Sequence, residues 1–309
     1  MEKNSKIYVA GHNGLAGSAI TERLKQEGYA NLVLKTHAEL DLMDPEATKN
    51  FFAQEKPEYV FLAAAKVGGI MANMTYPADF IYQNLVVQNN VIHNTYVNKV
   101  KKLLFLGSSC IYPKNCPQPM KEASLLSGDL EPSNKPYSMA KISGIVLCQS
   151  YNKQYGTNFI SVMPTNLYGP RDKYDLNASH VIPAMIIKFH QAKINNGKEV
   201  VAWGTGSPKR EFLYSDDLAR ACIFLMNNYN ESEIINIGTG IDISIKELAE
   251  LIKQTVGFRG EIKWDTTKPD GVQKKLLDVS KIEKLGWKYE TELNDGLKKA
   301  YKWYEKNLG

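Results

Sequence analysis

The chain has 309 residues, of which 43% are hydrophobic and 23% are charged, and its formal net charge at pH 7 is +5. This apolar content excludes an intrinsically disordered chain, and the length suggests one large domain or two coupled domains. No run of residues approaches the roughly 20 apolar residues of a membrane span, so no membrane association is expected. The opening residues 1–5 lack the apolar core of a signal peptide, which predicts a cytoplasmic location.

The first half of the sequence alternates short apolar runs with longer amphipathic stretches. Strands are predicted at 7–10, 32–34, 59–63, 102–106 and 159–163. Helices are predicted between them at 18–27, 45–54, 79–98 and 138–155. Because the strands are apolar throughout rather than alternating, they indicate a parallel sheet covered on both faces. The fold class is therefore predicted to be α/β, with a Rossmann-type doubly wound parallel sheet.

The regular alternation of strands and helices ends near residue 165. Loops rich in distinctive motifs then appear at 166–171, 203–213 and 237–240, with helices predicted at 182–195, 216–226 and 244–256. We interpret 1–165 as an NADP-binding Rossmann domain to which some later chain returns. Residues 166–309 are predicted to form mainly a smaller composite α/β lobe that binds the substrate.

A glycine-rich segment, Gly11-His12-Asn13-Gly14-Leu15-Ala16-Gly17, directly follows the first strand and opens the first helix. Glycines at this point permit a tight turn and a close approach of the backbone to a pyrophosphate at the helix N-terminus. A turn that binds no ligand would also use glycine, but this position favours dinucleotide binding. The spacing resembles the extended branch of the short-chain dehydrogenase/reductase superfamily. His12 either contacts a phosphate or is simply an exposed loop residue.

The end of the second strand bears on the choice of cofactor. An acidic residue there would bind the adenosine ribose and repel a 2′-phosphate. This chain has Lys35-Thr36-His37 instead, with no acid before Glu39. The pattern favours NADP(H), with Lys35 and His37 near the phosphate and Asp41-Leu42 near the adenine edge.

Tyr137 and Lys141 form a Tyr-x-x-x-Lys pair. On a helix this spacing places both side chains on one face, where an ammonium is expected to lower the pKa of the phenol. Ser108 or Ser109 closes the fourth strand, where a hydroxyl can bond a carbonyl oxygen. We choose Ser108, which stands four residues before Tyr112. The pair alone is common by chance, and its combination with the glycine loop is what indicates a reductase.

Longer motifs resemble one family within this superfamily. They lie at 63–70 (AAAKVGGI), 107–113 (GSSCIYP), 163–170 (MPTNLYGP), 179–184 (SHVIPA), 203–204 (WG), 210–213 (REFL) and 268–271 (KPDG). In this order, over nearly the whole chain, they resemble the GDP-L-fucose synthases, which are GDP-4-keto-6-deoxy-D-mannose 3,5-epimerase-4-reductases.

The resemblance implies a role for each matching residue. Cys110 corresponds to the base and His180 to the acid of epimerisation, while Ser108 and Tyr137 polarise the C4 oxygen. Tyr137, supported by Lys141, then donates a proton as NADPH delivers hydride. Further cofactor contacts are implied for Leu106, Gly107, Ser108, Ser109, Lys141, Pro164, Thr165, Asn166, Leu167 and His180. The nucleotide-sugar contacts are Lys188, Trp203, Arg210 and Asp270.

Some positions depart from the family. Asn13 and His37 stand where members often carry Arg, and Lys188 stands where Arg is common. The first departure removes a bidentate clamp for the 2′-phosphate, and the second loosens the geometry of diphosphate binding.

Alternatives remain open at this stage. Cys110 and Trp203 could be packing residues, and His180 a structural one. The substrate could be a related GDP-4-keto sugar such as a heptose, handled by an epimerase/reductase or by a C4-reductase. A catalytically inactive sensor is disfavoured because Ser108, Tyr137 and Lys141 are all present.

The remaining expectations concern partners and metals. Cys110, Cys116, Cys148 and Cys222 form neither a disulfide framework nor a zinc-site spacing, so no metal is expected. The lysines are scattered, which predicts no nucleic-acid binding. A homodimer through the helices at 79–98 and 138–155 is expected from the habit of the superfamily.

Overall fold

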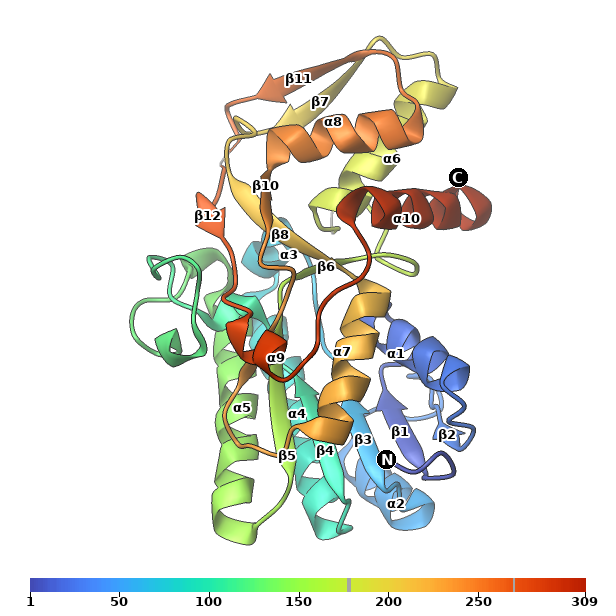
Figure 1. Ribbon diagram of the computed structural model, residues 1–309, viewed down its shortest axis with the longest axis vertical. Helices are drawn as coiled ribbons and strands as arrows, with labels where there is room; N and C mark the ends of the chain where they lie inside the picture. Colours follow the sequence, from blue (N-terminus) through green and yellow to red (C-terminus); the bar gives the residue numbers. More distant parts are fainter. Residues whose placement is uncertain (177–178, 269) are drawn as a thin grey trace.

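Six parallel strands form the main sheet in the order β2-β1-β3-β4-β5-β9 (Figure 1). The structure is a computed structural model that describes residues 1–176, 179–268 and 270–309. The strands are β1 (Ile7–Ala10), β2 (Leu32–Val33), β3 (Tyr59–Leu62), β4 (Lys102–Leu106), β5 (Phe159–Pro164) and β9 (Ile235–Ile237). Every residue of β1, β4 and β5 is buried, as the continuous apolar runs predicted.

Helices cover both faces of this sheet. On one face α1 (Leu15–Gln26) packs against α7 (Ser215–Asn228). On the other face α4 (Pro77–Val97) packs against both α2 (Pro45–Glu55) and α5 (Lys135–Tyr155). The predicted α/β class and doubly wound parallel sheet are therefore confirmed.

A smaller lobe lies beyond the carboxyl ends of the strands (Figure 1). Its sheet contains β10 (Asp242–Ser244), β8 (Lys209–Tyr214) and β12 (Lys274–Lys275), and β6 (Asn166–Tyr168) also pairs with β8. A separate pair joins β7 (Glu199–Trp203) to β11 (Glu261–Asp265). The helices that complete this lobe are α6 (Val181–Ile194), α8 (Ile245–Val256) and α10 (Leu293–Asn307). This lobe has its own hydrophobic cluster, distinct from the cluster around the main sheet.

The chain crosses between the two lobes more than once. After β8 it returns to the main sheet through α7 and β9, then enters the smaller lobe again at β10. The short helix α9 (Ser280–Lys284) packs against β9, so this segment near the C-terminus also lies beside the main sheet. The division of the chain at residue 165 stays a prediction. In the described ranges no helix is long and apolar enough to cross a bilayer.

Candidate active site

One large cavity, of about 1250 Å³, is lined by both lobes. Its wall includes the loops after β1, β3 and β4, where the carboxyl ends of parallel strands meet. Ten lysine and arginine side chains line it, against three carboxylates, Glu131, Asp172 and Asp270. The size and the positive charge suit two polyanionic ligands held side by side.

The glycine loop is shaped to bring the backbone close to a ligand. Gly11 has a φ of +83°, in the left-handed region that favours glycine. A Cβ on Gly17 would lie 2.1 Å from the carbonyl oxygen of Gly11, so a larger residue would displace the loop from α1. Gly14 has no such crowding and lines the cavity. The residues therefore fit a dinucleotide pyrophosphate at the N-terminus of α1.

Most of the predicted cofactor residues meet at this cavity. Those in its wall are Gly11, Gly14, Leu15, Ala16, Gly17, Lys35, His37, Leu42, Leu106, Gly107, Ser108, Ser109, Lys141, Pro164, Thr165, Asn166, Leu167 and His180. His12, Asn13 and Asp41 are not among the lining residues. The Asp41 carboxylate accepts a hydrogen bond from the backbone N–H of Met43 at 2.9 Å, so it is partly occupied within its own turn.

The reductase pair occupies the first helical turns of α5. Lys141 is buried, and its Nζ donates a hydrogen bond to the carbonyl oxygen of Leu106 at 2.7 Å. The same Nζ lies 5.9 Å from the ring centroid of Tyr137. Ser108 hydrogen-bonds the Tyr137 phenol and also accepts from the backbone N–H of Cys110 at 3.1 Å. The three side chains predicted to act together therefore do lie together.

The expected lowering of the Tyr137 pKa is wrong for this structure. Burial raises the pKa of the phenol, the nearby Cys110 raises it further, and the hydrogen bond from Ser108 only partly opposes them. Burial also lowers the pKa of Lys141 to about 7. Sequence spacing places an ammonium near a phenol, but it does not include the desolvation that both groups undergo.

Cys110 lies beside a cation that the sequence analysis did not identify. Lys275 of β12 donates from Nζ to Cys110 Sγ at 3.3 Å. Burial opposes ionisation of this thiol, but Lys275 and Ser108, with a smaller effect of Arg210, bring its pKa below the ordinary value. The only sequence signal was a basic pair, Lys274-Lys275, shortly after the KPDG motif.

His180 stands at the N-cap of α6 and is open to the cavity. The surrounding protein lowers the pKa of its imidazole by desolvation, and Lys275 lowers it further. Because the charge of one ammonium acts on both His180 and Cys110, these groups lie around the same part of the cavity. A thiol and an imidazole there can exchange protons with one bound molecule.

Trp203 and Lys188 line the outer part of the cavity, and Lys268 lies beside the Trp203 ring, outside the lining residues. The Trp203 side chain is 53% exposed, so it is not a core residue. Lys188 Nζ lies 5.4 Å from its ring, and Lys268 Nζ lies 5.6 Å from it. Lys188 also donates to the carbonyl oxygen of Val201 at 2.9 Å. Lys268 is a second cation that the sequence analysis missed, although it belongs to the KPDG motif.

Asp270 is held by a neighbouring turn. Its Oδ1 accepts from the backbone N–H of Thr205 at 2.7 Å, and its Oδ2 accepts from Thr205 Oγ1 at 2.8 Å. Arg210 lies beside the loop that carries Asp270, because its Nη2 would lie 3.6 Å from a Cβ on Gly271, and its Nη1 donates to the carbonyl oxygen of Lys209 at 2.8 Å. Asp270 therefore fixes the loop that carries Lys268, whereas Arg210 is available to an anion. Pro269 lies outside the described residues.

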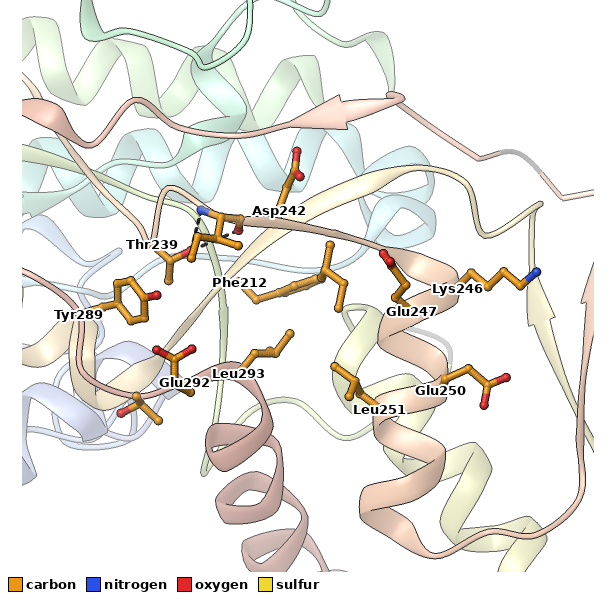
Figure 2. A pocket seen from close by; sticks show the side chains of 13 residues that line it. Phe212, Thr239, Asp242, Lys246, Glu247, Glu250, Leu251, Tyr289, Glu292 and Leu293 are labelled. Carbon is orange, nitrogen blue, oxygen red and sulfur yellow. Dashed lines mark hydrogen bonds between the residues drawn. The ribbon is translucent and has the colours of Figure 1, made fainter.

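A second cavity, of about 660 Å³, lies in the smaller lobe (Figure 2). Phe212, Leu251 and Leu293 converge in it, and Glu247, Glu250 and Glu292 lie around them. Phe212 lines both cavities and so separates them. None of the predicted site residues lines this second cavity.

Comparisons with known proteins agree with this geometry. The profile of the NAD dependent epimerase/dehydratase family matches residues 7–238. GDP-L-fucose synthase 1 of Arabidopsis thaliana is 59% identical over 99% of this chain and 95% of the relative. The GDP-L-fucose synthase of Escherichia coli is 52% identical over 98% and 97%. The solved structure of MlghC, a GDP-mannoheptose C4 reductase from Campylobacter jejuni with NADP bound, is 48% identical, covers 99% of each chain and has a TM-score of 0.90.

Proposed function

The chain belongs to the NAD dependent epimerase/dehydratase family and to its GDP-L-fucose synthases, and we propose that it converts GDP-4-keto-6-deoxy-D-mannose to GDP-L-fucose with NADP(H). The reaction comprises epimerisation at C3 and C5 and reduction of the C4 ketone. One observation carries the proposal: a single cavity contains the reductase residues Ser108, Tyr137 and Lys141 together with the thiol of Cys110 and the imidazole of His180.

Epimerisation needs a base and an acid around the sugar. The 4-keto group acidifies the protons on C3 and C5. Cys110 removes them as a thiolate, which Lys275 favours by lowering its pKa. His180 returns a proton to the opposite face at each centre. Ser108 and Tyr137 donate hydrogen bonds to the C4 oxygen and stabilise the enolate charge.

Reduction follows epimerisation, because the protons on C3 and C5 are acidic only while C4 is a ketone. Bound NADPH supplies the hydride to C4. Tyr137 gives its phenolic proton to the C4 oxygen, and Ser108 keeps that oxygen in position. Lys141, anchored on the carbonyl of Leu106, places its ammonium beside the Tyr137 ring as the phenolate forms.

The nucleotide diphosphate requires cations without competing acids. Lys188, Lys268 and Arg210 take part in no ion pair within the described ranges, and they surround the half-exposed Trp203 or the neighbouring turn. We assign the diphosphate to these three side chains and the cover over the sugar to Trp203. Asp270 acts through the turn at Thr205, which it holds in place.

We also propose that the protein is a cytoplasmic homodimer built on α4 and α5. These helices pack side by side and expose Tyr82, Val97, Val146 and Tyr155. Tyr96 stacks on Tyr155 with ring centroids 4.3 Å apart, which extends the apolar surface. Light scattering should therefore give twice the chain mass, and Val146→Glu should give a monomer. A monomeric wild-type protein would contradict this assembly.

The decisive experiment incubates the protein with GDP-4-keto-6-deoxy-D-mannose and NADPH and determines the product configuration by NMR. GDP-L-fucose is expected, and a product that retains the manno configuration at C3 and C5 would contradict the proposal. A second candidate, a GDP-4-keto-heptose, is favoured by the similarity to MlghC. Comparing kcat/KM for the two sugars distinguishes the candidates.

A further inference from the structure

The phosphate-binding end of the cavity lacks the arginines that the family resemblance leads one to expect. Asn13 stands in the glycine loop and His37 after β2, and Asn13 does not line the cavity. Lys35 and His37, which follow β2, are the basic side chains that this segment contributes to the wall. His37 is already 3.7 Å from the carboxylate of Asp41. A tightly bound polyanion needs a further cation here.

Arg171 reaches this end of the cavity from the smaller lobe. It follows β6, which packs against α1, the helix that the glycine loop opens (Figure 1). Its side chain lines the same cavity as Gly11, Gly14 and Lys35. It also lies near His12 of the glycine loop: burial and the charge of Arg171 both lower the pKa of that imidazole, while Glu39 raises it.

The guanidinium of Arg171 is available to a ligand. The side chain is exposed and joins no ion pair in the part of the chain that the structure describes. No ion pair joins it to the adjacent Asp172 in the described ranges, and burial raises the pKa of that carboxyl to about 7. Glu39, on the side of β2, accepts hydrogen bonds from the backbone N–H and the hydroxyl of Thr36 at 2.8 and 2.7 Å.

The backbone of Arg171 is unusual. Its φ is +61°, in the left-handed region that glycine and asparagine adopt far more readily than arginine. A long charged residue held in this conformation at the edge of a ligand cavity indicates a functional constraint.

We propose that Arg171 binds a phosphate of NADP(H) from the smaller lobe and replaces the arginine that the glycine loop lacks. The proposal rests on the use of NADP(H) proposed above. It makes cofactor binding a contact between the two lobes, because the glycine loop and Arg171 belong to different ones. Arg171 thereby contributes to cofactor affinity without touching the reacting atoms.

The test is the dissociation constant of NADPH and of NADH for Arg171→Asn, measured by titration of the folded protein. Asn is chosen because it suits the left-handed backbone, so thermal stability should not fall. We expect the Kd for NADPH to rise about 10- to 100-fold. An equal rise for NADH identifies the pyrophosphate as the partner, and a rise for NADPH alone identifies the 2′-phosphate.

Two further variants sharpen the test. Arg259→Asn, an exposed arginine outside the cavity wall, should leave both constants unchanged. Asn13→Arg added to Arg171→Asn should recover part of the lost affinity, because both guanidinium groups would serve the same phosphates. An unchanged Kd in Arg171→Asn, or no recovery on adding Asn13→Arg, would overturn the proposal. A wild-type protein that binds no NADPH would instead contradict the proposed function.

Discussion

The catalytic centre and the phosphate-binding ends of the cavity differ in how their charged groups are partnered. At the centre, polar groups are partnered within the protein: the buried Lys141 donates to Leu106, and the partly buried Lys275 donates to Cys110. At the ends, Arg171 in the wall and Lys268 beside Trp203 are exposed and join no ion pair within the described ranges. A buried polar group without a partner is strongly destabilising, whereas a cation already paired with a protein acid must break that pair to bind a ligand.

This difference separates the kinetic effects of substitutions. Groups at the centre act on charge that develops in the transition state, so their loss lowers kcat. Cations at the ends hold phosphates that do not change during the reaction, so their loss raises KM or Kd with kcat preserved.

The largest effect is expected from Tyr137→Phe. NADPH oxidation with the keto sugar should fall by at least about 10³-fold, because the phenolic proton is needed only in the transition state. Calorimetric affinity for GDP and for NADPH should stay within a few fold. Tyr151→Phe, on the same helix but outside the cavity wall, is the matched control. Near-normal turnover in a folded Tyr137→Phe would exclude Tyr137 as the proton donor.

Cys110→Ser should separate the two chemistries of the centre. Solvent deuterium wash-in at C3 and C5 should fall by about 10²- to 10⁴-fold, since a hydroxyl is a far poorer proton acceptor than a thiolate. Reduction of the unepimerised ketone should survive and give a GDP-6-deoxyhexose without the fucose configuration. Cys116→Ser, outside the cavity wall, is the control. Unchanged wash-in would make Cys110 a packing residue.

Lys275→Met should move the pH profile of deuterium wash-in rather than abolish it. The ammonium lowers the pKa of both Cys110 and His180, so its removal raises both. Both limbs of the profile should therefore shift to higher pH. The rising limb reports formation of the Cys110 thiolate, and the falling limb reports loss of the His180 imidazolium proton. At pH 7 we expect a loss of about 10-fold. Lys274→Met, whose ammonium pairs with Asp242, is the control, and an unshifted profile would remove Lys275 from the centre.

The smallest effect is expected from Lys268→Met at the diphosphate end. KM for the GDP-sugar should rise about 3- to 10-fold with kcat unchanged, and the rise should diminish at high salt. Lys263→Met, an exposed lysine of β11 paired with Glu199, should leave KM unchanged. A fall in kcat instead would show that the outer end of the cavity also takes part in the chemistry.

Much of the main sheet follows from the sequence pattern. Strands such as β4 and β5 are continuous apolar runs, and longer stretches with helical length and start signals separate them, so their type and order were predictable. β9 was not predicted because it has three residues, and its pairing with β5 depends on a chain that leaves the sheet and returns. Short strands have too few positions to show a period.

The sequence by itself determined the parallel α/β architecture, the glycine loop, and the identity of Ser108, Tyr137 and Lys141, because these depend on residues close together in the chain. Only the tertiary structure decided which charges act on them. Lys275 reaches Cys110 from 165 residues away, through a strand of two residues. Burial, not the neighbouring ammonium, sets the direction of the Tyr137 pKa shift. Long-range contact and desolvation arise when distant segments pack, so no local pattern contains them.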